Sequence, residues 1–155
     1  MYGFDSSSII HAWDHYPYHI KQFQNFWEWI GEQIINKQVV IPEVAFNELT
    51  TKSKECKDWL KEKDIQIIPT SNDIRVAASK IKSLLEIEND NYHPKGVSEN
   101  DIFIIATARC HNLSLVSNEE KQPSPPDTIR KYKIPAVCNL TEVAVLCMDI
   151  REYIN

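Results

Sequence analysis

The chain has 155 residues, of which 43% are apolar, and this is enough to bury a core and excludes a disordered chain. Its formal net charge of −5 does not fit a general nucleic-acid coat, which would be basic, but is compatible with a site that gathers carboxylates and recruits metal cations. With three glycines it contains neither a GxGxxG nor a Walker A phosphate loop.

The first ten residues are typical of a strand that leads directly into a helix. Tyr2 and Phe4 suit a buried, pleated surface, and Asp5 ends this apolar run. Residues 6–8 are serines, whose side-chain oxygens accept hydrogen bonds from the free N–H groups of a helix start. If this strand lies inside the sheet, Asp5 stands at its carboxyl end, where open α/β sheets bind ligands.

Two helices are expected next. Helical spacing of apolar residues continues towards Pro17, so the first helix should end near 15–16. A second helix is expected over 19–36, with an apolar stripe that faces a core. Trp29 falls outside this stripe and, with Trp13, is a candidate surface anchor for a partner.

The middle of the chain alternates short apolar runs with helical periodicity, which favours strands joined by helices. The expected elements are strands at 39–41 and 65–68, a helix that begins near Pro42 and carries Glu48, a helical piece at 54–63, a helix with apolar positions from Ile74 to Leu85, and a polar loop at 88–95.

The most apolar helix is expected at 100–110. Because it is apolar on most sides, it should be deeply buried. Ser98 is the predicted cap of this helix, and Asp101 lies in its first turn. A strand at 113–116 follows, and Glu119 comes just after it.

The end of the chain is expected to contain a proline-rich loop, a last short strand at 134–137 and a closing helix at 141–153. Strands that alternate with helices predict an α/β fold with a mainly parallel sheet. We see no internal repeat and no linker that would divide the chain, so a single domain over 1–155 is expected.

Four acids stand where such a fold places its site: Asp5, Glu48, Asp101 and Glu119. Each also has a purely structural explanation, such as a helix cap for Asp5 or an ion pair with Lys52 for Glu48. Gathered together, however, like charges raise one another's pKa unless a cation neutralises them. Oxygen ligands of this kind suit hard cations such as Mg²⁺ or Mn²⁺.

The segments around these acids resemble the ordered acidic motifs of PIN domains. The resemblance covers nearly the whole chain, and the stretch around Asp101 is the most specific part of it. Three further segments resemble a branch of PIN proteins long described as a domain of unknown function. The motif segments are 4–10, 48–49, 101–108 and 115–119, and the branch segments are 27–29, 58–60 and 134–138.

The resemblance implies an α/β/α sandwich around a parallel sheet and a metal-dependent ribonuclease, in bacteria often a VapC-type toxin of a toxin–antitoxin pair. It implies that Asp5, Glu48 and Asp101 are the principal acids, which hold Mg²⁺ or Mn²⁺ and hydrolyse RNA in line. Glu119 matches the fourth acid, where many PIN domains have aspartate, and its longer side chain could hold metal through water. Glu120 is a second candidate for that role, and Ser7 and Ser117 match polar positions near the metal.

The partners implied by the resemblance are an RNA substrate, a cognate antitoxin that covers the acidic pocket with an arginine, and a second copy of the chain in a homodimer. Two groups of basic residues could contact RNA phosphates beside the site. They are Lys52, Lys54 and Lys57, and Arg130, Lys131 and Lys133.

The four cysteines, at positions 56, 110, 138 and 147, form no CxxC pair, so neither a disulfide framework nor a zinc knuckle is expected. Reduced thiols in a cytoplasmic protein are the favoured interpretation. We find no signal-peptide pattern and no apolar run long enough for a bilayer, so no membrane is expected.

Other functions fit less well. His11, His15 and His19 have a spacing that could ligate zinc, but Pro17 interrupts that helix. A phospho-acceptor domain needs an acidic pair and a late lysine that the Ser117–Glu119 turn does not supply, and a haloacid-dehalogenase-type enzyme needs a second aspartate where Ser7 stands. The main alternative to an enzyme is a degenerate PIN-like binding module without nuclease activity.

Overall fold

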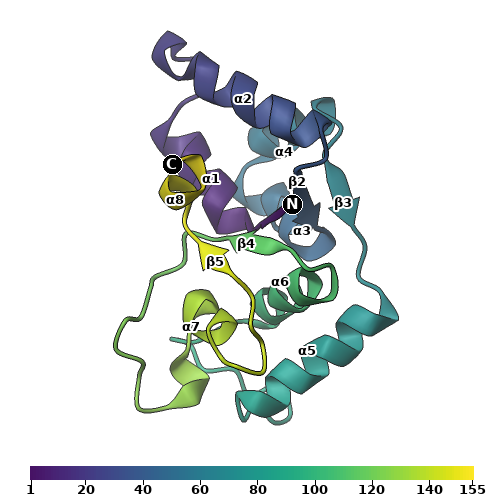
Figure 1. The fold of residues 1–155 in the computed structure, drawn as a ribbon, viewed down its shortest axis with the longest axis vertical. Helices are drawn as coiled ribbons and strands as arrows, with labels where there is room; N and C mark the ends of the chain where they lie inside the picture. Colours follow the sequence, from purple (N-terminus) through teal and green to yellow (C-terminus); the bar gives the residue numbers. More distant parts are fainter.

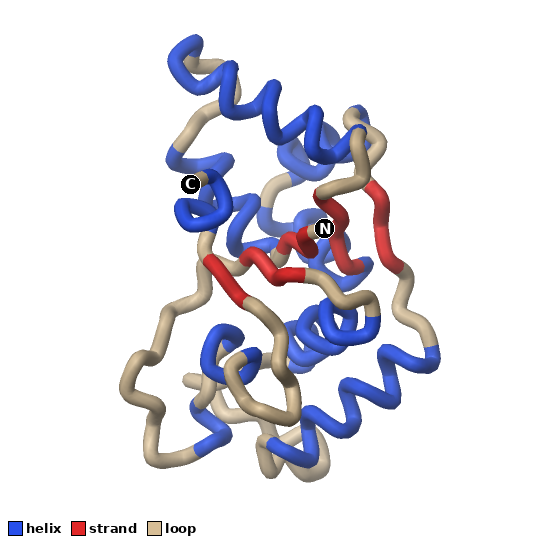
Figure 2. The backbone as a smooth tube through the Cα atoms, viewed as in Figure 1, coloured by secondary structure: helices blue, strands red, loops and turns tan.

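The computed structural model describes residues 1–155 and contains a five-stranded sheet in the order β3-β2-β1-β4-β5, in which all neighbours run parallel (Figures 1 and 2). β1 therefore lies at the centre, as the position of Asp5 requires for a site at the carboxyl edge. The strands are β1 (Tyr2–Phe4), β2 (Val39–Pro42), β3 (Gln66–Ile68), β4 (Ser114–Val116) and β5 (Cys147–Met148).

The helices lie on both sides of this sheet. In Figure 1, α1, α2 and α8 lie on one side, and α5, α6 and α7 lie on the other, so the expected α/β/α sandwich is confirmed. The helices are α1 (Ser6–His15), α2 (Gln24–Ile35), α3 (Glu43–Lys52), α4 (Lys54–Glu62), α5 (Asn72–Leu84), α6 (Glu99–Cys110), α7 (Ile134–Cys138) and α8 (Ile150–Ile154), with short 3-10 helices η1 (Lys21–Phe23) and η2 (Ile129–Lys131). None of them combines the length and apolar character that a membrane crossing requires.

The register of the central strands aligns the positions at which they end. Phe4 of β1 pairs with Val116 of β4, so the residues that follow them, Asp5 and Ser117, are neighbours. The Asp5 N–H donates to the Val116 carbonyl at 2.9 Å, which continues the ladder one residue beyond β1. The carboxyl ends of β1 and β4 thus open onto the same space.

α6 is the central helix beneath the sheet. Ser98 and Asp101 form a reciprocal capping box at its start, which confirms the predicted cap. Ile102, Ile104 and Ile105 are fully buried, as the nearly uniform apolar composition of this helix predicts.

An aromatic cluster, defined here by Trp13, Tyr18, Trp27 and Trp59, joins α1, α2 and α4. The Trp27 ring lies 5.1 Å from Trp13 and 5.0 Å from Trp59 between centroids, in edge-on geometry. Trp13 is therefore part of internal packing. The second tryptophan considered as a surface anchor, Trp29, has its ring 5.4 Å from that of Tyr153. Both indoles are half-buried against the core, and a contact of either with a partner stays a prediction.

Two expectations for the last part of the chain are wrong. Residues 134–138 form helix α7 rather than a strand, because Pro135 at the helix start has the fixed φ that suits this position. The expected helix at 141–153 is replaced by a turn with Ala144 at positive φ, then β5, then α8. Pairing of β5 with β4 outweighs the local helical spacing.

Candidate functional site at the carboxyl edge of the sheet

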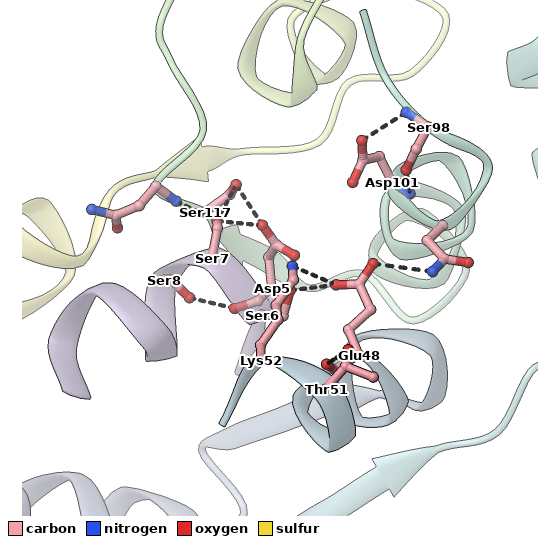
Figure 3. Close-up of polar contacts among 12 residues, drawn as sticks. Asp5, Ser6, Ser7, Ser8, Glu48, Thr51, Lys52, Ser98, Asp101 and Ser117 are labelled. Carbon is pink, nitrogen blue, oxygen red and sulfur yellow. Dashed lines mark hydrogen bonds and ion pairs between the residues drawn. The ribbon is translucent and has the colours of Figure 1, made fainter. Parts of the chain in front are cut away.

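Asp5 is buried at the end of the central strand, with 3% of its surface exposed. Its Oδ2 accepts hydrogen bonds from Ser7 Oγ at 2.5 Å and from Ser117 Oγ at 2.9 Å (Figure 3). Burial raises the pKa of Asp5 to about 6, against the opposing effect of these two hydroxyls. The two serines expected near the metal therefore orient this carboxylate.

Glu48 approaches from α3 and is surrounded by donors. Its Oε2 accepts from Ser6 Oγ and from Lys52 Nζ, the latter at 3.2 Å, and its Oε1 accepts from Asn100 Nδ2 at 3.0 Å. Burial opposes ionisation, but the hydrogen bonds from Ser6 and Asn100 and the charge of Lys52 outweigh it and hold the pKa of this carboxyl below its usual value. Glu48 is therefore fixed as an anion.

The Lys52 ammonium group lies inside the site. It donates to Ser6 Oγ at 2.8 Å as well as to Glu48, and in Figure 3 it lies beside Asp5. The other two lysines of its group, Lys54 and Lys57, pair with Asp58 and Thr50 outside the site. The expected phosphate-binding group of three lysines is thus divided by the structure.

Asp101 reaches the same space from the first turn of α6. Its Oδ2 accepts from the Ser98 N–H at 2.7 Å, which fixes the side chain at the helix start. Burial raises the pKa of Asp101, hydrogen bonds from Ser98 oppose this rise, and the negative charge of Glu48 adds to it. Asp101 is therefore both a cap and a carboxylate directed towards the other acids.

Glu119 lies in the turn after β4 and is half-buried. Burial and the negative charge of Asp101 raise its pKa, and Lys133, whose Nζ is 3.9 Å from Glu119 Oε2, partly opposes this. Glu120 is 72% exposed and pairs with the same lysine at 3.6 Å. Of the two candidates for the fourth acid, Glu119 is therefore the one turned towards the site.

The acids offer the oxygen ligands that a hard cation needs, but their side chains are not yet arranged around one position. Asp5, Glu48 and Asp101 point into one space in Figure 3, and neither Asp5 Oδ1 nor Asp101 Oδ1 accepts a hydrogen bond from the protein. Three or more metal-binding side chains do not converge closely enough to form a ready metal site. Each carboxylate is held by its own protein donors.

A family model and several solved structures are similar to this chain. Residues 2–155 match the model described as Domain of unknown function (DUF4411). The chain belongs to this family. A comparison with curated protein sequences found no match.

Three solved structures resemble this DUF4411 protein over almost its whole length. VapBC2 from Rickettsia felis, bound to a DNA fragment from its promoter, is 18% identical, covers 96% of this chain and 97% of its own, and has a TM-score of 0.52. FitAB bound to an IR36 DNA fragment is 13% identical with coverage of 96% and 94% and a TM-score of 0.54. FitAcB from Neisseria gonorrhoeae is 17% identical with coverage of 96% for both chains and a TM-score of 0.54. At such identities the likeness shows the fold, and the PIN-like architecture is confirmed.

In this family member the turn that carries Ser117 and Glu119 is held by hydrogen bonds to β5 and α8. The Ser117 N–H donates to the Met148 carbonyl of β5 at 2.9 Å. Asn118 Oδ1 accepts from the N–H of Ile150 in α8 at 3.0 Å, and the Asn118 N–H donates to Ser7 Oγ at 3.0 Å. Asn118 thus joins the serines of α1 to the last helix.

The sequence patterns did not indicate the roles of Ser6 and Asn100. Both hold Glu48, and each stands directly beside a candidate acid, Ser6 after Asp5 and Asn100 before Asp101. That adjacency was the available signal. Of the histidines considered for zinc, His11 and His15 stack at 4.0 Å on α1, and His19 lies beyond the end of that helix.

Proposed function

We propose that this protein is a metal-dependent endoribonuclease and the toxin of a bacterial toxin–antitoxin pair. The observation that carries the proposal is that Asp5, Glu48 and Asp101 face one space at the carboxyl edge of a parallel sheet, where Oδ1 of Asp5 and Oδ1 of Asp101 accept no hydrogen bond from the protein. Three different elements supply these acids, so a purely local explanation for each does not account for their convergence.

The donor set suits Mg²⁺ or Mn²⁺, because all candidate ligands are hard oxygen atoms. Such an ion, when bound, lowers the pKa of water and stabilises the charge that develops on a phosphodiester under in-line attack. Asp5, Glu48 and Asp101 would hold it, and Glu119 would hold it directly or through water. Ser7 and Ser117 keep Asp5 in place, while Ser6 and Asn100 keep Glu48 ionised and oriented.

The similar structures support the toxin part of the proposal. They are of VapBC2 and FitAB complexes, and the PIN-domain motifs of this chain resemble those of VapC-type toxins. We infer that a cognate antitoxin covers the acidic space, with an arginine that takes the place of the cation. A homodimer is also part of the proposal, by the same resemblance.

The test is cleavage of total RNA by the purified protein in Mn²⁺, in Mg²⁺ and in EDTA. Discrete fragments that require metal and disappear in Asp5→Asn are expected. Asp64→Asn is the matched control, because this aspartate is 97% exposed and pairs with Lys37 far from the site, and it should cleave normally. RNA that stays intact under every condition, in protein free of any copurifying inhibitor, would contradict the nuclease and favour a degenerate PIN-like binding module.

A further inference from the structure

A basic cleft lies beside the carboxylate site. It has a volume of about 340 Å³ and is lined by Lys95, Lys131 and Lys133, together with Glu120, Gln122 and two prolines. Lys133 reaches both the cleft and Glu119, so the cleft begins one side chain away from the fourth acid. The lining contains no large apolar side chain, which makes it unlike a pocket for a hydrophobic ligand.

The two walls of this basic cleft continue into the segments that carry the acids. On one wall, Lys95 is three residues before Ser98, the cap that holds Asp101. On the other wall, Glu120 directly follows Glu119. The cleft therefore adjoins the two segments that carry Asp101 and Glu119, and Lys133 links it directly to Glu119.

The cleft is held in shape by contacts between backbones. A Cβ added at Gly96 would lie 2.0 Å from the Arg130 carbonyl oxygen, so this approach requires glycine. The Val97 N–H donates to the Tyr132 carbonyl at 3.1 Å, a second contact between the segment at 96–97 and the segment at 130–132. Gln122 also binds the backbone of residues 131–133. Its Nε2 donates to the Lys131 carbonyl at 3.1 Å and its Oε1 accepts from the Lys133 N–H at 2.8 Å.

The lysines of the basic cleft carry more positive charge than the neighbouring carboxylates of the protein neutralise. Lys95 is exposed and forms no ion pair, and Lys131 has only Asp127, 3.9 Å away and 91% exposed. Lys133 is the one shared with Glu119 and Glu120. In a protein with a net charge of −5, two cations left this free beside a set of acids point to an anionic ligand.

We propose that the basic cleft binds the phosphodiester backbone of the RNA strand on one side of the bond that the carboxylates would cleave. RNA as the ligand rests on the proposed function. Repeated phosphates suit lysines placed along a polar wall, because each ammonium group neutralises one charge without reading a base. The cleft therefore contributes affinity and position, and no sequence preference.

The experiment measures binding of a fluorescent single-stranded RNA oligonucleotide by anisotropy across a series of salt concentrations, in EDTA so that no cleavage occurs. The double variant Lys95→Ala/Lys131→Ala removes two phosphate contacts and should lower the slope of log affinity against log salt by about 1.4. The arginine pair Lys95→Arg/Lys131→Arg should restore it. Lys61→Ala is the matched control, an exposed lysine of α4 without an ion pair, and should leave the slope unchanged.

Two results would overturn the proposal. One is an unchanged slope in the alanine pair. The other is an alanine pair that loses binding of a poly-glutamate peptide while its RNA binding is unchanged, which would assign the cleft to an acidic protein segment. Because binding is read in EDTA, a protein that never cleaves RNA but shows the expected loss would refute the nuclease and support the cleft.

Discussion

The two ends of helix α1 lie in opposite kinds of environment. Its last turns contribute Trp13 to the aromatic cluster, where its ring meets the buried Trp27 edge to face and Trp59 in tilted geometry. Its first turn carries the serines that hold Asp5 and Glu48, where burial works against the charged groups. Stability thus comes mainly from one end of the helix and chemistry from the other, so substitutions at the two ends should have separable effects.

The largest effect on folding is expected at Trp27, the buried centre of the aromatic cluster, which also donates to the Tyr16 carbonyl at 2.5 Å. Trp27→Ala should lower the free energy of unfolding by about 3–5 kcal/mol, measured by urea denaturation. Ile35→Ala on the same helix, at a side chain 61% exposed, should change it by less than about 0.5 kcal/mol. Equal losses in both variants would mean that the cluster is not a stabilising centre.

The largest effect on activity without an effect on folding is expected at Asp101. Asp101→Asn keeps a side-chain oxygen that can accept from Ser98 but loses the charge, so cleavage should fall at least about a hundredfold while the unfolding curve shows no loss of stability. Glu99→Gln, in the same turn and 54% exposed, should cleave normally. Full activity in Asp101→Asn would show that the site has been assigned to the wrong acids.

A gain in stability is expected from Asp5→Asn in EDTA. Burial raises the pKa of Asp5 to about 6 from an ordinary 3.8, and the charges of Asp101 and Glu48 add to this. The native state therefore holds this proton more tightly than the unfolded state does, so stability falls as pH rises from about 4 to 6 and the cost is complete above that.

Asparagine carries no charge, so the Asp5→Asn variant should be more stable at pH 7.5 by about 2 kcal/mol, within the limit of about 3 kcal/mol that the pKa difference allows. The pH dependence of its urea midpoint should also be flatter between pH 4 and 6. A variant less stable than wild type at pH 7.5 would contradict this account of the site.

The smallest effect concerns Lys52, whose ammonium group lies among the acids. Lys52→Met removes a positive charge 3.2 Å from Glu48 Oε2, so Mn²⁺ should bind several-fold more tightly in isothermal titration, since fewer cations compete for the same oxygens. Lys54→Met, at a lysine paired with Asp58 outside the site, is the control and should bind as wild type. Weaker Mn²⁺ binding in Lys52→Met would mean that this lysine supports the ligands.

The sequence predicts the features that depend on local chemistry. The strand before Asp5, the Ser98 cap of α6 and its burial are all visible as residue types at fixed spacing. The placement of Asp5 and Glu119 at one edge also followed, because parallel strands share a carboxyl edge. The assignment of Glu48 and Asp101, which lie on helices, rested on the resemblance to PIN domains.

Long-range contacts account for what could not be predicted. β5 exists because Cys147 and Met148 pair with β4, and its own sequence resembles a helix face instead. Asp149 and Glu152 form a capping box that marks the start of α8, and this local signal was present in the sequence. The support of Glu48 by Asn100 joins residues 52 positions apart, which no spacing rule reveals.

The hydrogen bonds of the Ser117–Asn118 turn to β5 and α8 have a consequence for folding during translation. Every candidate metal ligand is translated before residues 147–154, yet the turn reaches its final hydrogen bonds only after these residues leave the ribosome and fold. A growing chain would therefore carry all four acids in an unfinished arrangement. For a proposed ribonuclease, this order delays assembly of the site until residues 147–154 have been made and have packed onto the sheet.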